Sequence, residues 1–131
     1  MKKLILIISL MTISNYSFPE LKYIGILGKD DNVQIFINTD YEKKGSFVKV
    51  WWLLNYKNGT KNSLGKVIYS NNTLHHFDCS ERKVVLLGLV QYDDLMGKGN
   101  IIYNKDVSYS NDWEIIYPNS IMDGIRSEVC N

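Results

Sequence analysis

The 131-residue chain carries 15 basic and 14 acidic residues, so its formal net charge is only +1. A near-neutral chain lacks the basic excess with which proteins bind nucleic acids or anionic membrane surfaces. The length fits one domain with a modest core, and the absence of alanine beside abundant Tyr, Ile and Val favours strands over helices.

The first 17 residues have the layout of a secretory signal. Lys2 and Lys3 form a basic start, an apolar run follows over residues 4–13, and Ser17 supplies a small residue for cleavage. This run is too short for a stable membrane anchor, and no later run approaches the roughly 20 apolar residues of a transmembrane helix. We therefore expect a signal peptide over residues 1–17 and an exported mature domain over residues 18–131, with no integral membrane segment after cleavage.

The first half of the mature domain predicts three strands. Residues 21–27 and 32–38 are separated by a turn-rich cluster and are expected to pair as a hairpin. Residues 47–56 (FVKVWWLLNY) place apolar side chains on both faces, which is typical of a central strand covered on each side. Residues 57–62 are then expected to form an exposed loop.

The second half predicts further strands over residues 66–70, 73–79, 82–92, 100–104 and 112–117. The first two of these are either one strand interrupted at Asn71 and Asn72 or two separate strands. Residues 93–99 contain Asp and Gly in the pattern of a turn.

The C-terminal residues predict a short helix. Ser120 is placed as its N-cap, with Asp123 three residues later as a capping-box-like partner. Ile121, Ile125 and Val129 recur every four residues and form one apolar stripe. Because so short a helix is marginal in isolation, we expect the stripe to dock on the sheet.

Cys79 and Cys130 are the only two cysteines of the chain. Export places them where thiols oxidise, so a Cys79–Cys130 disulfide is the expectation, and it would fasten the far end of the helix. Closing a loop of about 52 residues would stabilise the fold by roughly 4 kcal/mol. The expected fold class is mainly β (α+β), with a single antiparallel sheet of about six strands and a C-terminal α-helix tied to the sheet by the disulfide.

Candidate catalytic chemistry is confined to the neighbourhood of Cys79. His75 and His76 precede it closely, so a hydrolase with a cysteine nucleophile is one hypothesis. A nucleophile needs a free thiolate, whereas a bond to Cys130 would consume the thiol. No acid, base and oxyanion site assemble elsewhere, and we expect the protein not to be an enzyme.

His76 and Asp78 share one strand face and could supply two ligands of a metal ion. A site needs three or four ligands, and the sequence has no second cluster of His or Cys. The acidic pairs at 30–31 and 93–94 lack the spaced oxygen ligands of a calcium loop, and residues 97–99 are too few for a phosphate loop. We expect neither a metal nor a cofactor.

Trp51 and Trp52 point to opposite faces of their strand. One is expected to fill the core under the helix. The other either packs beneath a loop or presents an exposed apolar surface that marks a partner site. Tyr41, Tyr103 and Tyr109 are candidates for the amphipathic contacts that protein interfaces use.

Several segments, in order, resemble the surface-adhesin protein E family of small exported bacterial proteins. They are Val48-Lys49-Val50-Trp51 with Leu53 and Tyr56, Ser70 with Phe77-Asp78-Cys79, Tyr92 with Met96-Gly97-Lys98-Gly99, Trp113 with Ile116, Pro118 and Ser120, and Val129-Cys130. The resemblance spans residues 23–130 and implies the same sheet with a disulfide-tied helix. It also implies a non-enzymatic role, binding of host proteins such as vitronectin, laminin and plasminogen, and an ability to form a homodimer.

The chain departs from the named adhesin of this family in one respect. That adhesin is a lipoprotein held by an acylated cysteine at its mature N-terminus, whereas no cysteine precedes Cys79 here. We therefore expect no lipoprotein anchor cysteine and a protein that is periplasmic or secreted.

Two function classes follow from these observations. The first is an exported protein-binding module that engages host extracellular matrix or serum proteins through residues 41–46, 57–66 and 93–98. The alternative is a periplasmic inhibitor or immunity-type protein acting on an exported hydrolase, a role that a small disulfide-tied β domain suits equally well.

Overall fold

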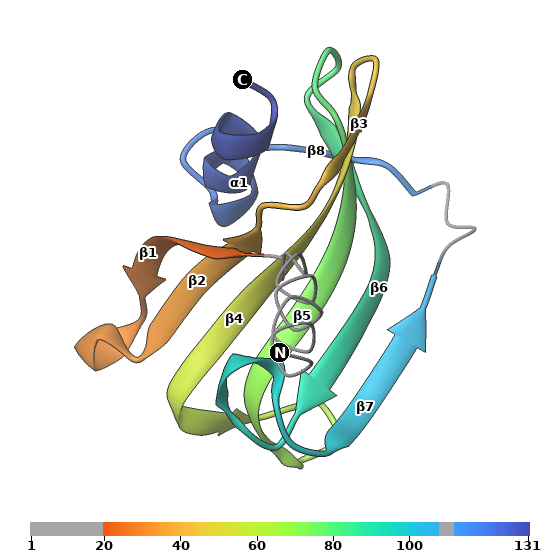
Figure 1. The fold of residues 1–131 in the computed structure, drawn as a ribbon. Helices are drawn as coiled ribbons and strands as arrows, with labels where there is room; N and C mark the ends of the chain where they lie inside the picture. Colours follow the sequence, from red (N-terminus) through yellow and green to blue (C-terminus); the bar gives the residue numbers. More distant parts are fainter. Residues whose placement is uncertain (1–19, 108–111) are drawn as a thin grey trace, which may run out of the picture.

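A computed structural model describes residues 20–107 and 112–131 of the chain (Figure 1). The expected signal peptide and Tyr109 lie outside these residues. The elements in chain order are β1 (Leu21–Leu27), the 3-10 turn η2 (Lys29–Asp31), β2 (Val33–Asn38), β3 (Glu42–Lys44), β4 (Phe47–Lys61), β5 (Val67–Asp78), β6 (Lys83–Tyr92), the 3-10 turn η3 (Leu95–Gly97), β7 (Ile101–Asp106), β8 (Glu114–Ile115) and α1 (Ile121–Val129).

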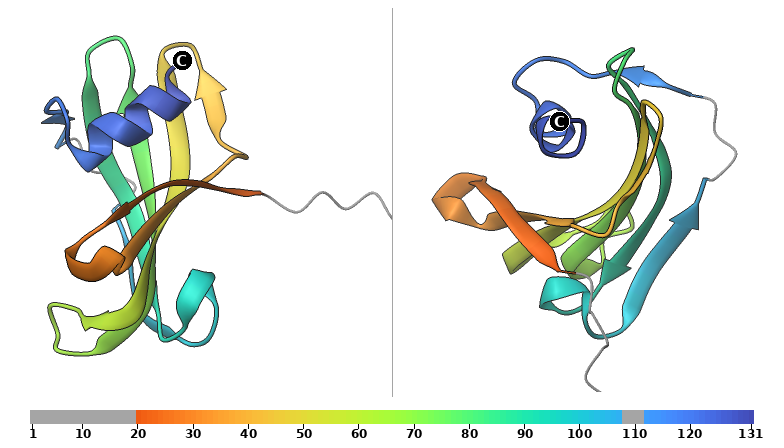
Figure 2. Two further views of the ribbon diagram at one scale, coloured as in Figure 1. Left: turned by 90° about the vertical axis from the view of Figure 1, so that its left-hand side faces the viewer. Right: turned by 45° about the horizontal axis from the view of Figure 1, so that its top comes forward.

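One antiparallel sheet contains all eight of these strands. Its main path runs β1-β2-β4-β5-β6-β7, while β3 pairs with β4 and β8 pairs with β6. The sheet curves around α1, which lies against one face (Figure 2). We call this face the inner face and the opposite one the outer face. The expected mainly β fold with one sheet and a C-terminal helix is confirmed.

The core lies between the inner face and α1. On β4, Val48, Val50 and Trp52 point inward and are buried together with Phe77 of β5. Fully burying each such side chain stabilises the fold by roughly 1.5–3 kcal/mol. Trp52 is therefore the tryptophan that fills the core, as one of the two was expected to do.

The helix begins as its sequence predicts. The Ser120 hydroxyl accepts a hydrogen bond from the Asp123 amide at 3.1 Å, and the Asp123 carboxylate accepts one from the Asn119 amide at 3.0 Å. Arg82, which precedes β6, donates to the same carboxylate at 3.1 Å and holds the start of the helix to the sheet. The first two of these contacts satisfy backbone amide donors at the start of the helix.

The far end of α1 is fastened covalently. Cys79, which follows β5, and Cys130, which follows α1, form the expected disulfide, with their Cα atoms 5.7 Å apart. On the helix, Ile125 and Val129 are fully buried, whereas Ile121 is 40% exposed. The apolar stripe therefore docks through two of its three predicted residues.

Four strand assignments from sequence were wrong or incomplete. Residues 57–61 were expected in a loop but belong to β4, because a register shift between Asn55 and Thr60 lets the strand continue and pair again with β5. Strand β5 runs without interruption through Asn71 and Asn72. Strand β3, which pairs with β4, was not predicted, and only Glu114–Ile115 of residues 112–117 form a strand.

Candidate binding surface

The cysteine that sequence placed beside two histidines has no nucleophilic role in this fold. Both cysteines are in the disulfide, so Cys79 carries no thiol. The neighbouring histidines also point apart, since His75 pairs across the sheet with the inward-facing Val50 and His76 with the outward-facing Lys49. The hydrolase hypothesis therefore lacks both its nucleophile and a shared site.

His75 is a structural acceptor on the inner face. The Trp52 Nε1–H donates to His75 Nδ1 at 2.7 Å, which requires that nitrogen to carry no proton. Burial lowers the pKa of His75 from 6.5 to about 4, because the charged imidazolium is poorly solvated there. The histidine is neutral at physiological pH and satisfies the polar atom of a core tryptophan.

This shift predicts a loss of stability in mild acid. Above pH 6.5 His75 is neutral in both states, but as the pH falls toward 4 only the unfolded chain gains its proton. The free energy of unfolding should therefore fall by up to about 3 kcal/mol across that window. Urea unfolding from pH 7.5 to 4 measures this slope. His75→Gln keeps an acceptor for Trp52 without titrating, and an equally steep slope in that variant would contradict the assignment.

His76 and Asp78 also have structural partners within the fold. The His76 ring lies 5.3 Å from the Trp113 ring and 5.4 Å from the Phe47 ring, centroid to centroid. Burial and the nearby Lys49 lower the pKa of His76. The Asp78 carboxylate accepts hydrogen bonds from the Ser80 amide and hydroxyl and so closes the turn after β5. Among the described residues, no three His, Cys, Asp or Glu side chains are grouped to hold a metal ion.

The loop around η3 is tied to the outer face. The Ser70 hydroxyl donates to the Asp94 carbonyl at 2.6 Å and accepts from the Gly97 amide at 2.9 Å. The Asn55 side chain accepts from the Met96 amide at 2.8 Å. Ser70 and Asn55 are buried beneath this loop, so residues 93–98 form a fixed cover over the sheet.

Gly99 closes this loop in a conformation that other residues resist. Its φ is +82°, and a Cβ atom there would collide with the Asp93 carboxylate, which itself bonds the Asn100 amide at 2.7 Å. We expect Gly99→Ala to lower the free energy of unfolding by about 2 kcal/mol. Gly45→Ala is the control, because Gly45 has φ +62° but open space around its Cβ position. Equal losses for both variants in urea unfolding would contradict the role of the collision.

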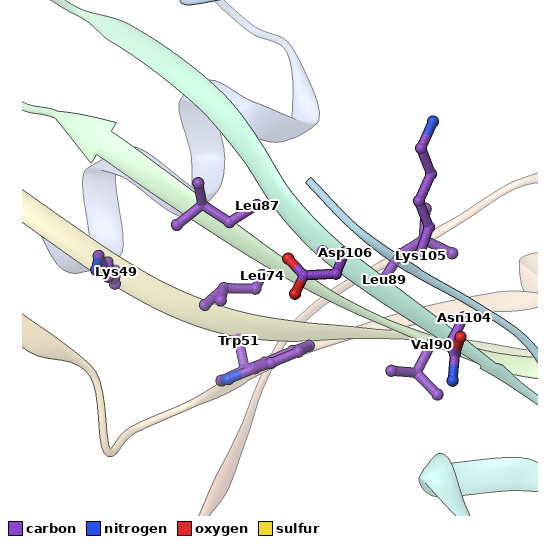
Figure 3. A pocket seen from close by; sticks show the side chains of 10 residues that line it. Lys49, Trp51, Leu74, Leu87, Leu89, Val90, Asn104, Lys105 and Asp106 are labelled. Atoms are coloured by element: carbon purple, nitrogen blue, oxygen red, sulfur yellow. The ribbon is translucent and has the colours of Figure 1, made fainter. Parts of the chain in front are cut away.

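The outer face between this cover and β3 is hollowed. Two adjoining hollows share Lys49, one of about 540 Å³ beside Trp51 and Leu74 and one of about 450 Å³ beside Phe47 and His76. Figure 3 shows the larger hollow, with side chains from four strands gathered around it. Trp51 is half-buried and lines the larger hollow, so it is not the tryptophan that packs under the helix.

The residues that the sequence analysis proposed for binding differ in how exposed they are. Residues 42–47 are exposed around β3, and Leu64 and Val67 are exposed apolar residues at the turn between β4 and β5. Tyr103 on the edge strand β7 is exposed, whereas Tyr41 packs against the core.

The sequence analysis did not predict the larger hollow, because the residues that line it come from four strands, β4, β5, β6 and β7. Its only signal in the sequence was Gly88, which lies within an otherwise apolar strand.

Comparisons with known proteins agree with this architecture. The sequence profile described as Surface-adhesin protein E matches residues 23–131. A structure of Haemophilus influenzae protein E is similar with a TM-score of 0.58 at 15% identity, covering 82% of this chain and 83% of that one. A crystal structure of protein E from non-typeable Haemophilus influenzae has a TM-score of 0.57 at 14% identity, covering 88% of this chain and 79% of that one. A search of curated proteins finds no match.

Within residues 20–107 and 112–131, no helix has the length and apolarity needed to cross a bilayer. The profile match covers almost the whole described chain, including both cysteines and the segments that hold the η3 loop. The chain belongs to the surface-adhesin protein E family.

Proposed function

We propose that this chain is an exported, non-enzymatic protein-binding module that engages a host extracellular matrix or serum protein. The observation that carries the proposal is the family match over residues 23–131. Two features of the fold support it. The groups that first suggested chemistry, namely Cys79, His75, His76 and Asp78, all have structural partners. The outer face offers open apolar surface of the kind that marks partner sites.

Export is a separate part of the proposal. Cleavage after Ser17 would release a mature chain that begins at Phe18. Mass spectrometry of the protein recovered from cell fractions of its native host measures the N-terminal residue and the compartment together. We expect a chain starting at Phe18 in the periplasm or the medium. An intact Met1 in the cytoplasm would contradict export.

Binding is tested with the processed protein immobilised on a biosensor surface. Vitronectin, laminin and plasminogen are the probes, and saturable binding to at least one of them is expected. The protein with Cys79 and Cys130 reduced is the control for a requirement for the native fold. Failure of the folded protein to bind any of these, together with crosslinking to a bacterial hydrolase in the periplasm, would overturn the proposal in favour of the inhibitor alternative.

The proposal includes a homodimer. Strands β1 and β7 end the main path of the sheet, and both carry exposed apolar residues, Leu21 and Tyr23 on β1 and Ile101 on β7. Unpaired edges of this kind are able to pair with a second chain. Light scattering of the processed protein across a concentration series gives the mass. A monomer mass at every concentration would contradict this part of the proposal.

A further inference from the structure

Residues 57–59 lie in a stretch of β4 that the sheet leaves unpaired. The pairing of β4 with β5 stops at Asn55 and resumes at Thr60, while the pairing of β4 with β2 ends at Tyr56. Among the residues that the structure describes, this stretch therefore has no paired partner in either neighbouring strand. It leads into the turn between β4 and β5, at the end of the sheet opposite to α1 (Figure 2).

Gly59 is the residue type that this stretch requires. Its φ is +71°, a conformation that residues with a side chain rarely adopt. A Cβ atom here would also lie 3.1 Å from the Tyr69 ring and 3.3 Å from the Val67 side chain. The fold therefore favours glycine directly after Asn58, and a glycine nitrogen has no neighbouring Cβ atom to hinder its approach to another group.

The Asn58 side chain is exposed and has no hydrogen-bond partner among the described residues. Its backbone amide is held, because it donates to Asn32 Oδ1 at 2.8 Å. The preceding amide, that of Lys57, donates to the Asn32 carbonyl at 2.9 Å. The side-chain amide of Asn58 can therefore turn toward the next backbone nitrogen, while Asn32 restrains the backbone on its other side.

We propose that Asn58 is a site of spontaneous deamidation in the folded protein. The Gly59 nitrogen gives its proton to water and attacks Asn58 Cγ. The new C–N bond closes a succinimide ring as the Cγ–Nδ2 bond breaks, and the nitrogen leaves as ammonia after taking up a proton. Water then adds to either ring carbonyl and gives aspartate or isoaspartate. The reaction consumes one water, releases one ammonia, and needs neither an oxidant nor an enzyme.

Isoaspartate at this position would change the end of the sheet. It carries the chain through the side-chain carbonyl of residue 58 and so lengthens the backbone by a methylene group before Gly59. Thr60, which pairs with Ile68, would then lose its register. The change would alter residues 57–66, one of the segments expected to bind a partner. The inference goes beyond the proposed function, because it assigns a covalent modification to a binding module.

Asn62 is the matched control for Asn58 in the same turn region. It also precedes a small residue, but its side chain is tied by three hydrogen bonds. It accepts from the Leu64 and Lys66 amides and donates to the Gln91 side chain, in each case at 3.0 Å. These bonds have to open before the side chain can be attacked, so the fold should protect Asn62 and leave Asn58 reactive.

The test follows deamidation of the folded, disulfide-bonded protein at neutral pH by peptide mapping with mass spectrometry. The rate at each site is divided by the rate at the same site in the reduced chain unfolded in guanidinium chloride. This ratio removes the effect of the following residue. We expect folding to slow Asn58 by less than about tenfold and Asn62 by more than about fiftyfold, since three bonds hold only the second.

Two variants test the restraint by Asn32. Asn32→Ala removes the acceptor of the Asn58 amide and should speed deamidation at Asn58 about threefold. Asn32→Asp keeps an acceptor and should match the wild-type rate. Neither variant should change the rate at Asn62. If Asn32→Ala does not fold, as judged from its amide spectrum, the comparison of Asn58 with Asn62 in the wild-type protein carries the test.

Two results would overturn the inference. One is an intact Asn58 in the folded protein over a period in which the unfolded chain converts it fully. The other is equal protection of Asn58 and Asn62 by folding. Equal rates at Asn58 in Asn32→Ala and the wild-type protein would overturn the role of Asn32. Because no binding partner is present in these experiments, their outcome is independent of the proposed function.

Discussion

Replacing Cys79 and Cys130 together with serine should lower the free energy of unfolding by about 4 kcal/mol. The two residues are 51 positions apart in sequence, and the bond removes the entropy that the unfolded chain would gain from opening this loop. With an m-value of about 1.5 kcal/mol/M, the urea midpoint should fall by roughly 2–3 M. Tryptophan fluorescence follows the transition.

The wild-type protein in excess reductant is the matched control for this variant. It should unfold at the same midpoint as the double serine variant, since both lack the bond and differ only in two sulfur atoms. A single replacement is less informative because the remaining cysteine keeps a free thiol, which can form a disulfide with a second protein molecule. A loss below about 1 kcal/mol would show that the unfolded chain is already compact around this loop.

Ile125→Ala should cost about 4 kcal/mol and is the largest effect that we expect from one side chain of α1. Ile125 is fully buried between the helix and the inner face, so its removal leaves a cavity that a disulfide-fastened helix cannot easily close. Urea unfolding measures the loss. Ile121→Ala is the control on the same helix, and it should cost less than about 1 kcal/mol because Ile121 is largely exposed.

Combining Ile125→Ala with loss of the disulfide distinguishes docking from general packing. If α1 stays docked without the bond, the two losses should add within about 0.5 kcal/mol. If the bond holds the helix in place, removing it already loosens Ile125, and the combined loss should be smaller than the sum. A cost for Ile121→Ala equal to that for Ile125→Ala would contradict the burial on which both expectations rest.

The elements with strong local signals could be predicted from the sequence. Alternation in β4 and the Ser120 cap with the stripe of α1 depend on neighbouring residues, and both appear in the structure. The prediction that Ile121 docks on the sheet was wrong. Helical periodicity shows which face of the helix is apolar, but it does not show how far along that face the sheet extends. The short strand β3 has no apolar alternation of its own, and its pairing with β4 decides its conformation.

The candidate site was harder to predict because its parts are distant in sequence. The alternation of β4 showed that Trp51 and Trp52 point apart, but not which of them the helix covers. Gly88 and Asp106 reach Trp51 only through three consecutive strand pairings, and a register shift between Leu74 and His75 sets their alignment. Likewise, residues 93–98 are typical of a free loop until Asn55 and Ser70, from two other strands, are seen to hold them.

The disulfide also determines how this domain would respond to stretching. Tension applied between Glu20 and Asn131 would pass along the backbone to Cys79, cross to Cys130, and bypass every residue between them. Strands β6 to β8 and α1 would carry no covalent tension while the bond is intact. The extensible length would then be roughly 200 Å, against nearly twice that for the reduced chain. If the protein were stretched between a cell and a surface, almost half of its fully extended length would become available only after the disulfide is reduced.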